Sequence, residues 1–233
     1  GGLSQAEIAK YLDRSPNEFY RMLDRLVKRG YVTKLEGDRY SLTLKLFGLA
    51  HLHAPVRRLA SFATPFMREL ADRSKQANQL AVFDRGSVVV IAQQEAPDYW
   101  GISIRVGSHI SLFDTGSGHV LLAFRTPEER KMMIAEYVKD GESGNLDESF
   151  YERLDQIRER GYEMMPSAQV AGVYNLSAPI LGPDGSCIAA LTCPYVTLVN
   201  STFAPDITQT ISLLQKTVKD LSKLVGSDIG TTD

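Results

Sequence analysis

The chain has 233 residues, of which 43% are hydrophobic and 23% charged. This composition is ordinary for a globular protein and excludes a fibrous or low-complexity class. No run of about 18 apolar residues occurs and no signal peptide is visible, so we expect a cytoplasmic protein without membrane association. Only two cysteines are present, Cys187 and Cys193, and both are expected to be buried free thiols.

The charge is distributed unevenly along the chain. Residues 1–60 contain eleven Lys and Arg against six Asp and Glu, a net charge of +5, whereas the remainder carries −7. A basic N-terminal region followed by an acidic remainder is typical of a protein whose N-terminal region binds nucleic-acid phosphates. The asymmetry alone is weak evidence, because a difference of this size also arises by chance.

The first forty residues carry the signals of two short helices. Ser4 and Glu7 form a capping box, which predicts a helix that ends near Leu12. A second capping box, 15–18 (SPNE), places Pro at the first helical position of the next helix. Apolar residues at helical spacing predict the buried stripe of this helix: Phe19, Met22, Leu23, Leu26 and Val27. Gly30 is expected to end it.

Two strands, 31–34 and 39–42, are expected after these helices, joined by the turn 35–38. The order helix, turn, helix, hairpin is typical of a winged helix-turn-helix that binds DNA. The second helix would then enter the major groove, and an arginine of the wing would meet a phosphate or the minor groove. The predicted DNA-binding residues are Ser15, Pro16, Asn17, Tyr20, Arg21, Arg25 and Arg39. Glu18 is expected to serve its capping box rather than a cytosine.

A linker helix is expected at 44–58, where apolar residues recur at helical spacing. A further helix should run over 56–73, with Pro65 as a kink or a restart. His51 and His53 are two residues apart and cannot share a helix face, so no metal site is expected there.

From Ala77 onward the pattern predicts an α+β domain with a mostly antiparallel sheet. The expected strands are 80–83, 88–94, 101–106, 176–181 and 187–193, and the expected helices are 119–124, one from Thr126, 147–160 and 205–225. Small residues at 115–118 precede a helix and would present free N–H groups to an anionic ligand. The alternative is a purely structural loop, and the spacing fits neither a dinucleotide nor a Walker motif.

Five segments carry a family resemblance over nearly the whole chain: 23–32 (LDRLVKRGYV), 39–42 (RYSL), 106–124 (VGSHISLFDTGSGHVLLAF), 157–162 (IRERGY) and 178–191 (APILGPDGSCIAAL). In order and spacing they resemble the IclR-type transcriptional regulators. The resemblance implies an α+β protein with a winged helix-turn-helix at 1–43, a linker helix at 44–58 and a GAF-like effector-binding domain at 59–228, its antiparallel sheet flanked by helices. It also implies that the family's first helix is absent here.

The resemblance further implies an effector pocket, a DNA operator as partner and assembly as a homodimer or a dimer of dimers. The implied effector-binding residues are Tyr99, Ile102, Asp114, Thr115, Gly116, Ser117, Met165, Val173, Asn175, Thr192 and Pro194. His119 stands where the family usually has Lys and counts as a further donor. Met165 and Pro194 are apolar where members that bind carboxylates have polar groups. A bulkier or more apolar organic acid, such as an aromatic acid, is therefore expected, with no cofactor.

The resulting prediction is a sequence-specific DNA-binding regulator whose DNA affinity is controlled by a small-molecule effector. The alternative is a dimerisation or protein-interaction module that senses a ligand but makes no DNA contact. An enzyme is not expected, because no GxSxG pattern occurs, the four histidines are scattered and no Cys/His metal spacing exists.

Overall fold

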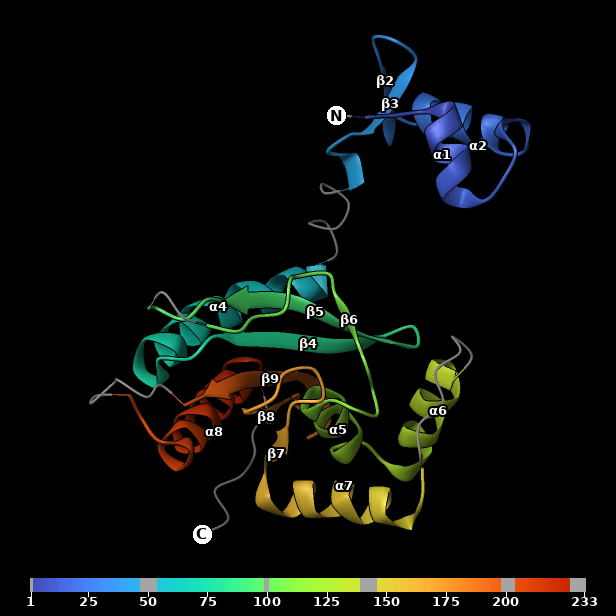
Figure 1. The fold of residues 1–233 in the computed structure, drawn as a ribbon. Coiled ribbons are helices and arrows are strands. Elements are labelled where there is room, and N and C mark those ends of the chain that lie inside the picture. The colour runs from blue at the N-terminus through green and yellow to red at the C-terminus, as the bar shows by residue number, and fades with distance from the viewer. Residues whose placement is uncertain (1, 47–53, 99–100, 139–145, 198–203, 227–233) are drawn as a thin grey trace. The chain divides into compact units, whose positions relative to one another are not determined.

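The computed structural model describes residues 2–46, 54–98, 101–138, 146–197 and 204–226 (Figure 1). The chain divides into two compact units, Gly1–Arg57 and Arg58–Asp233, each of which is described by itself. The middle of the expected linker helix, 47–53 with both of its histidines, lies outside the described residues. None of the described helices is long and apolar enough to cross a bilayer.

The N-terminal unit is a winged helix-turn-helix. Its elements are β1 (Leu3–Ser4), α1 (Gln5–Leu12), α2 (Pro16–Lys28), β2 (Val32–Leu35) and β3 (Arg39–Leu42). The three strands form an antiparallel sheet in the order β1-β3-β2. The capping boxes are confirmed, since the N–H groups of Ser4 and Ser15 each donate to the carboxylate three residues on, at 2.7 Å. Gly30 follows α2 with φ +73°, as expected.

The core of this unit is small. Four residues are buried together, Ala9, Phe19, Leu23 and Val32. The prediction that Met22 belongs to the core was wrong, because its side chain is 54% exposed. Met22 lies about 60° around the helix from Phe19, at the margin of the apolar stripe. The short α1 covers only the centre of that stripe.

The C-terminal unit is built on a six-stranded antiparallel sheet in the order β6-β5-β4-β9-β8-β7. The strands are β4 (Asn78–Asp84), β5 (Ser87–Gln94), β6 (His109–Ile110), β7 (Glu163–Pro166), β8 (Val173–Leu181) and β9 (Cys187–Val196). The helices are α4 (Ala54–Ser74), α5 (Gly116–Ala123), α6 (Pro127–Val138), α7 (Glu148–Arg160) and α8 (Ile207–Leu224). The expected α+β class with an antiparallel sheet is confirmed.

Two hydrophobic clusters cover the two faces of this sheet, so the unit has three layers (Figure 1). Helices α4 and α8 pack on one face, where Leu80, Leu176 and Leu191 meet Met67 and Leu214. Helices α5, α6 and α7 pack on the other face. Helix α4 is continuous through Pro65. The central strands β4, β8 and β9 therefore lie between two covered faces, which explains why most of their residues are buried.

The prediction of a strand at 101–106 was wrong. Residues 101–105 have no regular pairing, and only His109 and Ile110 pair with β5. Ile102, Ser103 and Ile104 all line a cavity, so this segment forms part of a cavity wall rather than a strand of the ladder. Strand β7 carries only four residues and was not expected. Both cysteines are buried, as expected, and burial raises the pKa of Cys187 and Cys193 to about 12, which leaves them unreactive thiols.

Candidate functional site

Helix α2 presents an exposed polar face opposite its core side. Tyr20, Arg21 and Arg25 are exposed, and Ser15 is the exposed N-cap. Pro16 and Asn17 occupy the first turn, and their side chains lie outside the described residues. Positions 17, 20, 21 and 25 share one side of a helix, because residues three and four apart are neighbours. The described members of this set, Tyr20, Arg21 and Arg25, therefore lie on one accessible surface.

Arg39 is placed differently from the other predicted DNA-binding residues. Its guanidinium donates to the carbonyl oxygen of Gly2 at 2.6 and 3.1 Å and pairs with the Glu7 carboxylate at 3.3 Å. The Arg39 side chain therefore links β3 to Gly2 and to α1. Glu18 serves its capping box, as expected, since it accepts from the N–H of Ser15.

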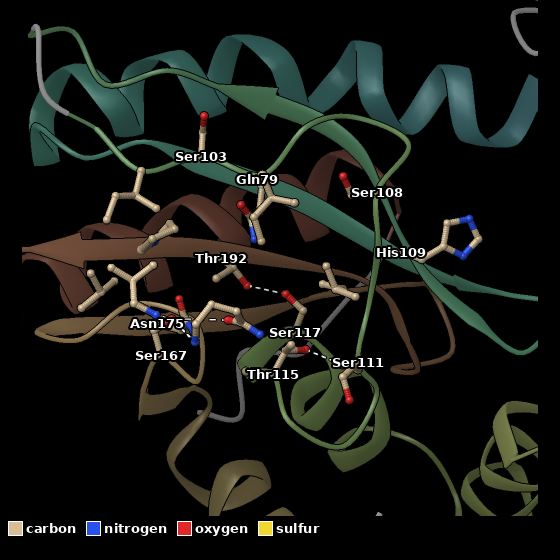
Figure 2. Close-up of a pocket in the computed structure, with 18 residues that line it drawn as sticks. Gln79, Ser103, Ser108, His109, Ser111, Thr115, Ser117, Ser167, Asn175 and Thr192 are labelled. Atoms are coloured by element: carbon tan, nitrogen blue, oxygen red, sulfur yellow. Dashed lines mark hydrogen bonds between the residues drawn. The ribbon is translucent and has the colours of Figure 1, made fainter. Parts of the chain in front are cut away.

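A cavity of about 450 Å³ lies between α5, the sheet and the 102–111 loop (Figure 2). Among the residues predicted from the sequence, Ile102, Thr115, Gly116 and Ser117 line it from the loop and α5. Val173, Asn175, Thr192 and Pro194 line it from β8 and β9. The described lining residues include no Asp, Glu, Lys or Arg.

Three of the described candidate residues, Asp114, Met165 and His119, do not line this cavity. Asp114 is exposed and accepts a hydrogen bond from the Ser111 hydroxyl at 3.0 Å. Met165, Asp114 and His119 line a separate hollow of about 290 Å³ beside α7. Tyr99 lies outside the described residues. The expectation of a rather apolar ligand depended partly on Met165, and that support is lost.

Sequence reasoning missed the polar residues that complete the lining. The loop contributes the hydroxyls of Ser103, Ser108 and Ser111, strand β6 contributes His109, strand β4 contributes Gln79, and the residues after β7 contribute Ser167 and Gln169. A signal for Gln79 was present in the sequence, because this polar residue directly precedes the apolar segment 80–83 (LAVF). The loop serines carried no signal, because their positions depend on where the loop crosses the sheet.

A row of polar side chains crosses the sheet beneath α5. Direct cross-strand pairing places Glu163, Ser177, Thr192, Gln79 and Gln93 next to one another on strands β7, β8, β9, β4 and β5. Directly paired residues project from the same face of a sheet. This polar row therefore faces α5, in the middle of an otherwise apolar layer.

Helix α5 packs directly on the polar row. The Thr192 hydroxyl lies 2.7 Å from the Ser117 hydroxyl (Figure 2). It also lies 2.7 Å from the Ser177 hydroxyl. A Cβ at Gly116 would lie 2.5 Å from the Ser177 hydroxyl, so this position requires glycine. The Thr115 hydroxyl caps Gly118 N–H at 3.1 Å. The N–H groups of Gly116 and Ser117 lie in the first turn of α5 and have no acceptor within the helix.

His119 and Glu163 hold the base of α5. The His119 ring lies 3.2 Å from Glu163 through Nδ1 and 2.6 Å from the Phe113 carbonyl oxygen through Nε2. Arg153 and Arg160 also donate to the Glu163 carboxylate, at 3.0 and 2.6 Å. Burial acts to raise the pKa of Glu163, but the hydrogen bonds from His119 and Arg153 outweigh it and hold the pKa below its ordinary value. His119 is therefore a buried structural group here rather than a ligand donor.

Comparison with known proteins agrees with this architecture. The family model of the bacterial transcriptional regulator IclR C-terminal domain matches residues 53–223. The HTH-type transcriptional regulator KdgR of Escherichia coli strain K12 is 32% identical over 196 residues, which cover 82% of this chain and 74% of KdgR.

Solved structures are similar in fold. An IclR homolog of Microbacterium hydrocarbonoxydans in complex with 4-hydroxybenzoate superposes with a TM-score of 0.77 at 20% identity, over 96% of this chain and 91% of the homolog. The C-terminal domain of E. coli KdgR gives a TM-score of 0.58 at 26% identity, over 72% of this chain and 98% of that domain.

A winged helix-turn-helix followed by a separate domain with a ligand cavity defines a class of ligand-responsive transcriptional regulators. The chain belongs to the IclR family of bacterial transcriptional regulators. It is therefore a regulator of transcription and not an enzyme.

Proposed function

We propose that this regulator binds duplex DNA by placing the exposed face of α2 in the major groove. The carrying observation is the accessible cluster of Ser15, Tyr20, Arg21 and Arg25 on a helix held by a capping box at its N-terminus. Arginine pairs with guanine edges or with phosphates, and asparagine, the residue type at position 17, pairs with adenine. Arg39, already bound to Gly2 and Glu7, is proposed to support the wing rather than the DNA.

We also propose that a small organic monoacid occupies the cavity of the C-terminal unit. Its carboxylate would accept from the N–H groups of Gly116 and Ser117 at the N-terminus of α5, where the helix dipole favours an anion. The neutral lining of Asn175, Thr192 and the loop serines supports one negative charge on the ligand rather than several. The volume of about 450 Å³ falls in the range of small-molecule sites.

The two activities are proposed to be coupled in a dimer or a dimer of dimers that acts in the cytoplasm, where its DNA lies. Two copies of α2 would meet half-sites about one helical turn apart. An effector that favours one arrangement of the two DNA-binding units changes DNA affinity by its differential affinity for the arrangements, typically ~1–3 kcal/mol.

Selection from a random-sequence duplex library tests this proposal. The full chain at low salt should enrich one motif with two related half-sites. Bound complexes should then respond to an organic acid such as 4-hydroxybenzoate or D-gluconate, supplied at millimolar concentration. Absence of any enriched motif after several rounds would favour the protein-interaction module over the DNA-binding regulator.

A further inference from the structure

Two glutamines near the start of β4 are equally buried but differently bonded. Gln76 and Gln79 are each 3% exposed. The amide of Gln76 donates to the carbonyl oxygen of Val196 at 2.9 Å and accepts from the N–H of Val196 at 3.0 Å. The side-chain oxygen of Gln79 has no hydrogen-bond partner among the described residues. Gln76 thus joins β9 to the segment before β4, whereas Gln79 keeps an open acceptor.

The open acceptor lies in the effector cavity. Gln79 lines it and is the direct cross-strand neighbour of Thr192, whose hydroxyl contacts Ser117 on α5 (Figure 2). The other members of the polar row are satisfied. Glu163 has His119 and two arginines, the Ser177 and Thr192 hydroxyls bond each other, and Gln93 bonds Glu95.

An unpartnered amide oxygen inside a protein reduces folding stability, and native structures retain few such atoms. The cavity therefore favours a ligand that supplies the missing hydrogen bond to the Gln79 oxygen. The Gln79 oxygen requires a donor, and the amide nitrogen beside it is itself a donor. A hydroxyl group can serve both, whereas a second carboxylate cannot donate to the oxygen when ionised.

We propose that Gln79 is the residue that selects for a hydroxyl group on the effector, so that the ligand is a hydroxylated monocarboxylic acid. This inference rests on the proposed acid site at the N-terminus of α5. The carboxylate meets Gly116 and Ser117, and a hydroxyl elsewhere on the ligand meets Gln79. An acid that lacks the hydroxyl leaves the buried amide unpaired and is rejected.

A melting experiment without ligand separates a binding role from a structural one. Gln76→Leu removes a satisfied amide and should lower the melting temperature by about 5 °C. Gln79→Leu replaces an unsatisfied amide by an apolar group of similar size and should leave the melting temperature unchanged or raise it. Equal destabilisation by both substitutions would overturn the proposal, because Gln79 would then be a structural residue.

Calorimetric titration of the full chain tests selectivity with two matched pairs. One pair is 4-hydroxybenzoate against benzoate, and the other is D-gluconate against hexanoate, so the two arms distinguish an aromatic from an aliphatic hydroxy acid. The wild-type chain should bind the hydroxylated member of one pair at least about 100-fold more tightly. Gln79→Leu should reduce that preference to within about threefold.

Gln93→Leu is the matched control for this titration, because Gln93 pairs with Gln79 across the ladder but does not line the cavity. This variant should keep the wild-type preference. A Gln79→Leu variant that also keeps the preference would contradict the proposal. If the wild-type chain binds none of the four acids, the proposed effector class fails, and the melting comparison alone then decides whether Gln79 is structural.

Discussion

The two units of this regulator place their polar side chains in opposite ways. In the winged helix, Arg21 and Arg25 are exposed on a helix whose core is only four residues. In the C-terminal unit, Glu163, Thr192 and Gln79 are buried in a row across the sheet. A large polyanion can be bound by charges that remain in water, whereas a small ligand must be enclosed by groups that neighbours hold in place. Substitutions of the exposed arginines should therefore lower DNA affinity without lowering stability, whereas substitutions of a fully bonded member of the polar row, such as Glu163, should lower the stability of the second unit.

The largest effect is expected from a substitution in the small core of the winged helix. Phe19→Ala should destabilise this unit by about 3–5 kcal/mol, because Phe19 is one of its four buried residues. DNA binding should be lost while the C-terminal unit keeps its thermal transition in calorimetry. Met22→Ala, on the exposed margin of the same helix, should change little. A single shared transition that both substitutions shift equally would refute the independence of the two units.

The next effect concerns the contact between α5 and the polar row. Gly116→Ala should destabilise the C-terminal unit by about 1–3 kcal/mol, because the new Cβ displaces the Ser177 hydroxyl from Thr192. Ligand response should fall, while DNA binding at a permissive temperature persists. Gly172→Ala serves as the control in thermal melts, since its Cβ meets open space and only its φ of +78° opposes the change. Equal stability of the Gly116→Ala variant and the wild-type chain would argue against the close approach.

The contribution of Glu163 to the stability of the C-terminal unit should depend on pH. Its pKa is lowered in the folded state, so its contribution to stability is present above the ordinary carboxyl pKa and is lost as pH falls through the folded value. Glu163→Gln should destabilise by about 1–3 kcal/mol at neutral pH. The difference from wild type should shrink in acid, as thermal melts from pH 7 to pH 3 would show. Glu159→Gln, on the exposed side of α7, should show no such dependence, and a pH-independent loss for Glu163→Gln would contradict the assignment.

Local signals in the sequence predicted the N-terminal unit well. Capping residues, Pro16 at the helix start and Gly30 after it act through bonds three or four residues apart, which can be read without the fold. Met22 was misplaced because the width of a buried stripe depends on the partner that covers it.

The C-terminal site was only partly predictable. The turn before α5 was recognisable, because small residues before a helix have a local meaning. The polar row was not, since it arises from strand registers that join Glu163 to Gln93 across most of the sequence of this unit. The β-branched residues of 101–106 predicted a strand, but β propensity does not distinguish a sheet strand from a loop that lines a cavity, as Ile102 and Ile104 do.

The salt dependence of DNA binding tests the DNA-binding role of α2 most directly. Fluorescence anisotropy would follow a selected duplex with the full-length wild-type chain and with the Arg21→Ala, Arg25→Ala double variant. We expect wild-type affinity to fall steeply with salt, and the log–log slope of the double variant to be shallower by about one to two, with an unchanged melting temperature. Identical slopes for the two proteins, or no binding by the wild-type chain at low salt, would contradict the account.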